Sequence, residues 1–246
     1  MRLTQDDHII QDISVILPCF NESHTIPQTL EILSEFLDSI NRKYEIIVSD
    51  DGSTDMTPKL DWQSYYNQFC VRYIRSDINS GKGAALRQGL LSSRSKFIFL
   101  IDSDLPVELE ALARCLTILE NNEADLVIGD RKLSESKAIG SAPKSRFIAS
   151  KLFNLGVQIL VLPGYTDTQC PMKGITREAM SQILPACFLT SFAFDVELLY
   201  LAKLHGMRIK RLPVTWRDAR ADIPVGKLTY LVLTCLKDVA LVRLKN

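Results

Sequence analysis

An alternation of short apolar runs with helix-like segments constrains the fold of this 246-residue chain more than any other feature. Each run is rich in β-branched or aromatic residues and ends in a polar loop. Between the runs, apolar residues recur every three or four positions, which is the spacing of an amphipathic helix. Strands that alternate with helices favour a mostly parallel sheet covered on both faces. The five runs are ISVIL (13–17), EIIVS (45–49), VRYIR (71–75), FIFLI (97–101) and DLVIG (125–129).

The expected helices fill most of the chain between and after these runs. The first has Thr25 and Gln28 in the positions of a capping box. After residue 131 the alternation is less regular, although MKGIT (172–176) and 207–216 have strand-like patterns. The helices are expected at 25–40, 55–68, 83–92, 106–120, 144–160, 195–205 and 228–244.

The length suits one α/β domain with small additions. We expect a tail at 1–11, the domain at 12–222 and an amphipathic helix at 223–246 that either contacts a membrane or packs on the core. The formal net charge is zero, so nothing indicates a nucleic-acid partner. However, residues 203–246 hold ten Lys or Arg against three Asp, which suggests an anionic partner, either phosphate or a lipid surface.

Cysteine usage and hydropathy bear on location. The six cysteines are scattered without a CxxC pair, which is typical of a reduced, cytosolic protein. The N-terminal residues are polar and lack a signal-peptide core, and no apolar run reaches the ~20 residues of a membrane span. We therefore expect a cytoplasmic protein, not secreted, that rests peripherally on the cytoplasmic face of a membrane.

Two carboxylates follow the apolar run FIFLI. In an extended chain, residues two positions apart point the same way, so Asp102 and Asp104 present oxygens to one side. Hard cations such as Mg²⁺ or Mn²⁺ take one or two carboxylates together with waters and phosphates. The alternative is that Asp104 only caps the following helix.

Two further loops suggest nucleotide binding. In SDDGSTD (49–55), an aspartate is suited to accept a hydrogen bond from a nucleobase, although DG is also an ordinary turn. NSGKG (79–83) is neither a dinucleotide fingerprint nor a P-loop, but it places Lys82 where a phosphate can bind at a helix start. A phosphoacceptor receiver domain has similar aspartates, but after a different strand. A nucleotidyltransferase needs a glycine-rich loop after the first strand, and PCFNES is not one.

Taken in order, ISVILPCFNE, EIIVSDDGSTD, NSGKGAALRQG, FIFLIDSDLP and DLVIGDR resemble the family 2 glycosyltransferases of GT-A fold. That fold is a Rossmann-like, mostly parallel sheet flanked by helices. The later segments DTQCPMKGITREA, FDVELLYLA and KDVALVRLK are most similar to the polyprenyl-phosphate glycosyltransferases, in particular the dolichyl-phosphate β-glucosyltransferase branch. The resemblance covers about residues 12–245.

This resemblance implies a nucleotide-sugar donor (UDP-glucose), a divalent cation (Mg²⁺ or Mn²⁺) and a polyprenyl phosphate acceptor. Carried over position by position, the donor site comprises Pro18, Asn21, Glu22, Asp50, Asp51, Lys82, Gly83, Asp102, Ser103 and Asp104, with Asp102 and Asp104 as metal ligands. The acceptor phosphate is assigned to Arg131, Arg146, Ser150, Lys173 and Lys227, and the reaction to Asp104, Arg131 and Arg146. Asp167, Gln169 and Lys173 match a further family segment.

The chain departs from the family pattern at two loops. Pro171 stands where the family usually has Gly, and RDARADIPVGK (217–227) lacks the usual Gly-Ser-Lys. Only Lys227 keeps its place there, and Arg220 is displaced by one residue. These differences bear on how a loop closes over the diphosphate.

The implied reaction is direct displacement at the anomeric carbon with inversion. A lipid phosphate is already ionised near neutral pH, so it needs cationic side chains to hold it rather than a general base. If the acceptor is instead a hydroxyl on lipid, glycan or protein, a base is required, and Asp195 or Glu197 is the candidate.

Overall fold

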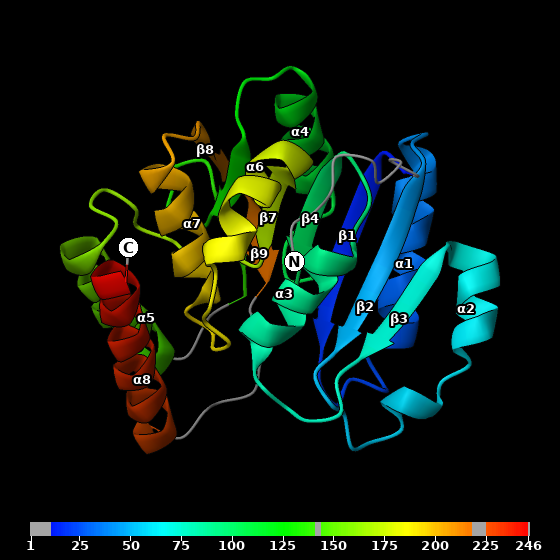
Figure 1. The fold of residues 1–246 in the computed structure, drawn as a ribbon, viewed down its shortest axis with the longest axis horizontal. Coiled ribbons are helices and arrows are strands. Elements are labelled where there is room, and N and C mark those ends of the chain that lie inside the picture. Colours follow the sequence, from blue (N-terminus) through cyan, green and yellow to red (C-terminus); the bar gives the residue numbers. More distant parts are fainter. Residues whose placement is uncertain (1–10, 141–143, 218–224, 246) are drawn as a thin grey trace.

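The fold is built on a seven-stranded sheet with the strand order β3-β2-β1-β4-β7-β5-β8 (Figure 1). The structure, a computed structural model, describes residues 11–140, 144–217 and 225–245, with only the backbone given for 144–149 and 225–228. Each strand pairs in parallel with its neighbours except β7, which is antiparallel to both β4 and β5. The strands are β1 (Ile13–Cys19), β2 (Tyr44–Asp50), β3 (Val71–Arg75), β4 (Phe97–Ile101), β5 (Leu126–Asp130), β7 (Met172–Thr176) and β8 (Ile209–Pro213).

Alternate residues of the strands pack into two hydrophobic clusters, one on each face of the sheet. In β1, Ile16 joins one cluster, whereas Val15 and Leu17 join the other, as the two-residue period of a strand requires. Helices α1 and α4 cover the second face, and α3, α5, α6, α7 and α8 cover the first. The predicted sheet, with helices on both faces, is therefore confirmed.

The helices lie close to the predicted ranges. They are α1 (Ile26–Ser39), α2 (Trp62–Phe69), α3 (Lys82–Ser92), α4 (Glu110–Glu120), α5 (Lys144–Leu160), α6 (Arg177–Ile183), α7 (Phe194–Leu204) and α8 (Val225–Lys245), with 3₁₀ turns η1 (Thr57–Lys59) and η2 (Leu184–Ala186). A small second sheet pairs β6 (Lys137–Ile139) with β9 (Thr215–Arg217). The strands β6 and β9 and helix α6 were not predicted as separate elements.

Three local predictions were wrong. The capping box is absent, because the Thr25 side chain makes no cap hydrogen bond. The helix expected at 55–68 is divided, since Pro58 lies in the turn η1 and Asp61 caps a new helix by accepting a hydrogen bond from Ser64. The helix expected at 106–120 begins later, because Val107 instead forms a β-bridge with Trp216.

The parallel strands bring their polar ends to one edge of the sheet. In Figure 1, the arrowheads of β1, β2 and β3 point to the lower edge, where the loops that follow them meet. Ligands of such sheets bind beyond the carboxyl ends, where the strand order reverses. Here the order reverses between β1 and β4, so the loops after these two strands define the place to search.

Candidate active site

A cavity of about 410 Å³ opens at this edge of the sheet. Loops after β1, β2, β3 and β4 form most of its wall. Seven of the predicted donor residues line it, namely Pro18, Glu22, Asp51, Lys82, Asp102, Ser103 and Asp104. The other lining residues are Cys19, Phe20, Asn79, Gly81, Ala85 and Phe192. The structure thus brings together residues that are widely separated in the sequence.

Asp51 connects the loop after β2 to the loop after β3. Its two carboxylate oxygens accept hydrogen bonds from the backbone N–H groups of Ser80 (2.9 Å) and Gly81 (2.6 Å). Gly52 follows with φ +76, and a Cβ at this position would lie 2.7 Å from the backbone of Ile78. Only glycine fits this conformation and this close approach. The two loops therefore form one continuous wall of the cavity.

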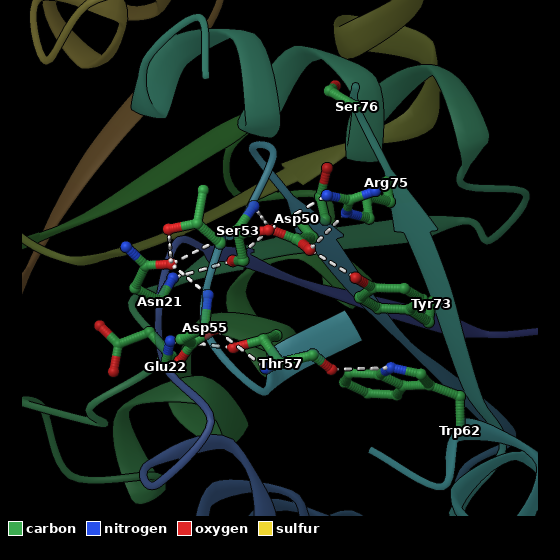
Figure 2. Close-up of polar contacts among 12 residues, drawn as sticks. Asn21, Glu22, Asp50, Ser53, Asp55, Thr57, Trp62, Tyr73, Arg75 and Ser76 are labelled. Atoms are coloured by element: carbon green, nitrogen blue, oxygen red, sulfur yellow. Dashed lines mark hydrogen bonds and ion pairs between the residues drawn. The ribbon is translucent and has the colours of Figure 1, made fainter. Parts of the chain in front are cut away.

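Asp50, the neighbouring acidic residue, lies beneath the loop and is fully buried (Figure 2). Its carboxylate accepts hydrogen bonds from the backbone N–H (2.8 Å) and Oγ (2.5 Å) of Ser53, and from the hydroxyl of Tyr73. Arg75 Nε is 3.4 Å away, and the Tyr73 ring stacks on Trp62 with centroids 4.1 Å apart. Asp50 was predicted to bind the nucleotide beside Asp51, but its contacts hold the loop from below.

Asn21 has a similar supporting position (Figure 2). It adopts φ +57, and its side-chain oxygen accepts hydrogen bonds from the backbone of Thr54 (2.8 Å) and Asp55 (3.2 Å). Its own N–H donates to Ser53 Oγ (2.8 Å). Asn21 therefore fastens the loop after β1 to the loop after β2, instead of lining the cavity.

Asp55 completes this connection. Its carboxylate accepts hydrogen bonds from the backbone N–H groups of Ser23 (3.1 Å) and Thr57 (2.9 Å). Burial opposes its charged form, but these hydrogen bonds lower the pKa of Asp55 below its ordinary value. The carboxylate is thus held ionised as a brace between the two loops.

Asp102 and Asp104 both line the cavity, and a turn rather than an extended strand positions them there. Strand β4 ends at Ile101, and Leu105, with φ +42, donates its N–H to the carbonyl of Asp102 (3.1 Å). The alternative role for Asp104 as a helix cap is excluded, since α4 begins only at Glu110 with Leu109 as its N-cap. Lys82 Nζ is 2.5 Å from Asp102 Oδ1.

These residues fit a divalent cation. Among the described side chains, no cluster of three or more His, Cys, Asp or Glu groups could hold a metal. Two carboxylates on one cavity wall are nevertheless the protein share of a typical Mg²⁺ or Mn²⁺ site, in which waters and substrate phosphates supply the remaining oxygens. Asp102 and Asp104 are the residues that would hold the ion.

Arg131 forms a largely buried ion pair with Asp167, a residue to which no role was assigned from the sequence. Its Nε and Nη2 donate to the two carboxylate oxygens of Asp167, at 2.7 and 2.8 Å, and its backbone N–H donates to the same group at 2.9 Å. Burial opposes both charges, yet their mutual hydrogen bonds raise the pKa of Arg131 and lower the pKa of Asp167. The charge of Asp102 also raises the pKa of Arg131, so the guanidinium lies within electrostatic reach of the cavity.

Lys173 is buried rather than presented to an acceptor. Its ammonium donates to the carbonyl of Cys170 (2.6 Å) and lies 3.0 Å from Asp195 Oδ1. Only 2% of Lys173 is exposed, because antiparallel strand β7 places it between β4 and β5. This position does not suit the predicted contact with an acceptor phosphate.

The remaining predicted acceptor residues lie at the starts of α5 and α8. The side chains of Arg146 and Lys227 lie outside the described residues, as do Arg220 and most of the loop 217–227. Ser150 is half-buried, and its Oγ accepts a hydrogen bond from Asn154 (3.3 Å). Gly83, predicted to contact the donor, is buried and donates its N–H to the carbonyl of Thr190 (2.8 Å).

Glu197 and Asp195, the candidate bases for a hydroxyl acceptor, both already bind other groups of the protein. Glu197 is fully buried, and its carboxylate accepts the N–H groups of Phe188 and Leu189, each at 3.0 Å. Burial raises the pKa of Glu197 above its ordinary value. Asp195 is the partner of buried Lys173. Neither residue lines the cavity that holds the predicted donor residues.

The comparison with known families agrees with this geometry. The sequence model of the family described as glycosyl transferase family 2 matches residues 14–184, which contain every strand-end loop of the cavity. The chain is a family 2 glycosyltransferase.

Relatives of this glycosyltransferase match it over most of its length. It is 35% identical over 217 residues to the dolichyl-phosphate beta-glucosyltransferase of Dictyostelium discoideum, a match that covers 84% of this chain and 66% of the relative. It is 31% identical over 251 residues to the human dolichyl-phosphate beta-glucosyltransferase, with 97% and 77% covered.

Solved structures share the fold of this glycosyltransferase. Glucosyl-3-phosphoglycerate synthase from Mycobacterium tuberculosis, crystallised with Mn²⁺, UDP and glucosyl-3-phosphoglycerate, superposes with a TM-score of 0.67 at 18% identity, covering 96% of this chain and 81% of that one. The same enzyme with Mn²⁺, UDP-glucose and glycerol 3-phosphate gives a TM-score of 0.66 at 19% identity, with the same coverage. The GT-A fold predicted from the motifs is confirmed.

Proposed function

We propose that this glycosyltransferase moves glucose from UDP-glucose onto a polyprenyl phosphate, with inversion at the anomeric carbon. The observation that carries the proposal is the 31% identity to the human dolichyl-phosphate beta-glucosyltransferase, which extends over 97% of this chain. The cavity supports it, because residues proposed to meet the base (Asp51, Asn79) and residues proposed to hold the metal (Asp102, Asp104) line the same cavity.

The proposed roles in the donor half follow from the contacts. Asp51, whose position is fixed by the loop 79–81, accepts a hydrogen bond from the base. Asp102 and Asp104 hold Mg²⁺ or Mn²⁺, which when bound neutralises charge on the leaving diphosphate. Lys82, already 2.5 Å from Asp102, contributes a positive charge beside the same diphosphate. These groups stabilise charge that develops only as the bond to the sugar breaks.

The acceptor half needs positive charge rather than a base. A phosphate monoester is ionised near neutral pH, so it can attack without losing a proton to the protein. The engagement of Glu197 and Asp195 elsewhere supports this acceptor over a hydroxyl. Arg131 remains the proposed phosphate ligand. Because its Nε and Nη2 groups donate to Asp167, we expect the phosphate to bind through Nη1. Arg146, Ser150 and Lys227 are proposed to complete the site.

Exposed apolar residues on α5 and α8 support the proposal that the protein binds the lipid acceptor at a membrane surface. The two helices pack against each other and bury Phe153, Val157 and Val239, but the opposite face is apolar and open to solvent. Lys151 and Lys237 are exposed on the same two helices and suit anionic headgroups. Among the described residues, no helix is long and apolar enough to cross a bilayer. In the described parts of α5 and α8, the large apolar residues that are more than half exposed are Leu152, Leu155, Ile159, Tyr230, Leu233 and Leu244.

A transfer assay tests the proposed function. The protein is incubated with Mn²⁺ and UDP-glucose, GDP-mannose or UDP-N-acetylglucosamine, with and without a polyprenyl phosphate. Of the three donors, we expect only UDP-glucose to give a glycosylated lipid, and we expect no product when the metal is omitted. Asp104→Asn should abolish transfer, whereas Asp77→Asn, in the loop that precedes Asn79, should retain it. Transfer at the wild-type rate by Asp104→Asn would show that the metal assignment is wrong.

A second assay distinguishes the acceptor classes. Arg131→Ala is compared with wild type on polyprenyl phosphate and on a hydroxyl acceptor such as the corresponding alcohol. Selective loss with the phosphate supports the proposed acceptor. Equal loss with both would instead show that Arg131 acts only by holding Asp167.

A further inference from the structure

Phe192 is an aromatic side chain of the cavity wall that comes from none of the strand-end loops. It lies in the loop between η2 and α7 and lines the same cavity as Lys82 and Asp102. Its side chain is large and apolar, yet 44% of the residue is exposed. A single exposed aromatic residue is unremarkable on a protein surface, so its position and its support have to decide whether it serves a ligand.

The backbone that carries Phe192 is firmly held. Hydrogen bonds tie this loop to α3, α7, α8 and the segment before β7. They join the carbonyl of Thr190 to Gly83 (2.8 Å), the carbonyl of Phe192 to Gln169 (3.1 Å), Phe188 and Leu189 to Glu197 (3.0 Å each), and Ser191 to Asp238 (2.6 Å). The ring is therefore presented to the cavity from a fixed support, which is how a binding surface is preorganised.

Contacts of the ring place it on the metal side of the cavity. Lys82 Nζ lies 5.9 Å from the centroid of the Phe192 ring and 2.5 Å from Asp102 Oδ1. The ring thus stands next to the group that would meet the diphosphate. In a nucleotide sugar, the hexose is attached to the end of the diphosphate away from the base. The hexose is therefore the part of the donor that comes to lie beside Phe192.

We propose that Phe192 is a platform for the donor sugar. One face of a hexopyranose presents mainly C–H groups, and this face packs well on an aromatic ring. Such a contact needs no hydrogen bond, and it orients the sugar while the polar groups of the cavity hold the diphosphate. The inference rests on the proposed function, because it requires a nucleotide sugar in this cavity. It adds a residue that determines affinity for the sugar rather than for the nucleotide.

Titration calorimetry with UDP and UDP-glucose, both in the presence of Mn²⁺, tests the platform. Phe192→Ala should weaken UDP-glucose binding by about three- to tenfold and leave UDP binding unchanged. Phe192→Tyr keeps the ring and should retain wild-type affinity for both ligands. Phe20→Ala is the matched control, because Phe20 is also a half-exposed phenylalanine of this cavity (43%) but lies in the loop after β1, which Asn21 joins to the loop that carries Asp51. It should weaken both ligands alike.

The outcomes separate this inference from the proposed function. Thermal unfolding of each variant verifies that the half-exposed ring is removed without loss of the fold. If Phe192→Ala binds UDP-glucose as tightly as wild type, or loses UDP and UDP-glucose equally, the platform is wrong and the proposed donor still stands. If the wild-type protein binds UDP but shows no affinity for UDP-glucose, the proposed donor is wrong and the platform fails with it.

Discussion

At the scale of single residues, two adjacent aspartates take different positions, one in the wall of the cavity and one buried behind it. Asp50 and Asp51 are adjacent, but only Asp51 lines the cavity, whereas Asp50 accepts hydrogen bonds from Ser53 and Tyr73 beneath it. Burial and the hydrogen bond to Asp50 raise the pKa of Tyr73, so its hydroxyl keeps its proton and donates. Tyr73 therefore supports the loop that carries Asp51 without lining the cavity itself.

This arrangement predicts the effect of Tyr73→Phe. Loss of a hydrogen bond to a charged group should lower the free energy of unfolding by about 1–3 kcal/mol. Because the loop that carries Asp51 is loosened, we also expect the KM for the donor to rise about fivefold, the equivalent of about 1 kcal/mol. Tyr44→Phe is the matched control, since the Tyr44 hydroxyl also donates to an aspartate, Asp38 (2.9 Å), outside the cavity. An unchanged KM in Tyr73→Phe would refute the positioning role.

The Arg131–Asp167 pair predicts a pH-dependent contribution to stability. Asp167 is 1% exposed, so Asp167→Asn leaves a largely buried guanidinium unpaired and should lower the free energy of unfolding by about 3–5 kcal/mol near neutral pH. The folded-state pKa of Asp167 lies below its ordinary value. Its contribution is therefore complete above about pH 5 and is lost as the pH falls below the ordinary pKa and through the lowered one.

Urea titrations of wild type and Asp167→Asn between pH 7 and pH 3 measure this effect. The difference in the free energy of unfolding should stay constant down to about pH 5 and then shrink. The control is Asp125→Asn, because Asp125 forms a similar fork with Arg208 at the surface, where the arginine side chain is 49% exposed. Its cost should remain within about 1 kcal/mol. A larger cost for Asp125→Asn would contradict the ranking by burial.

At the scale of elements, α3 packs closely on the loop 188–193, and both contribute residues to the cavity. Gly83, in the first turn of α3, packs so closely that a Cβ would lie 2.8 Å from Thr190 and Ser191. Lys82 and Phe192, which flank this contact, both line the cavity, with Lys82 Nζ 5.9 Å from the ring centroid. A side chain at position 83 has to push the two elements apart.

We therefore expect Gly83→Ala to reduce both stability and transfer. Overpacking of a close contact typically costs about 1–3 kcal/mol, which exceeds the gain of up to about 1 kcal/mol that alanine brings to a helix. Melting temperature and UDP-glucose affinity are the measurements. Leu91→Ala, at a 43% exposed position of the same helix, is the control and should change neither strongly. A more stable Gly83→Ala protein would show that the contact is not tight.

The sequence predicts these elements unevenly, for physical reasons. Apolar runs and polar strand ends are local signals, and parallel pairing then brings Asp51, Lys82, Asp102 and Asp104 to one edge without further information. The strand at MKGIT was predicted, but its antiparallel position between β4 and β5 was not. That pairing joins residues far apart in the sequence, such as Phe97 and Thr176, so no local pattern indicates it. The capping box predicted at Thr25 does not form, and Asp61, which caps α2, was not predicted as a cap. Thr and Asp also occur in turns, so the sequence alone does not distinguish a cap from a turn.

The same limit explains what was missed in the site. Arg131 was identified by its motif, but its partner Asp167 is 36 residues away, and burial of Lys173 depends on its strand being central. Phe192 belongs to an irregular loop, so no periodicity marks it. Its only local signal is its place two residues before the helix that begins at Phe194.

At the scale of the whole molecule, the α5–α8 face predicts membrane binding. Leu155→Asp combined with Leu233→Asp places charge at two positions that are 53% and 62% exposed. Sedimentation with vesicles of neutral lipid and of neutral plus anionic lipid measures the effect. We expect wild type to bind the anionic vesicles better and the variant to bind both poorly. Ile32→Asp, on α1 at the other side of the molecule (Figure 1), should bind as wild type does. Equal binding by all three proteins would exclude this face.

The inner side of α8 bears on the predicted boundary between the domain (12–222) and the C-terminal helix (223–246). Cys235, Val239 and Val242 are at most 3% exposed and belong to the same hydrophobic cluster as Ile16 of β1 and Ile98 of β4. Asp238 in addition accepts a hydrogen bond from Ser191 of the loop that carries Phe192. A helix packed in this way should unfold together with the sheet rather than as a separable unit.

Val239→Asp tests this because it buries an unpaired charge in the shared cluster. We expect it to cost more than about 3 kcal/mol and to lower the single unfolding transition of the whole molecule, measured by both circular dichroism and tryptophan fluorescence. Leu233→Asp makes the same chemical change on the exposed side of the same helix and should leave that transition within about 0.5 kcal/mol of wild type. Two separate transitions, with the sheet unaffected by Val239→Asp, would instead show that α8 is an independent appendage. The paired variants thus distinguish the two sides of one helix, since the buried side should stabilise the domain and the exposed side is the one we propose for contact with a lipid surface.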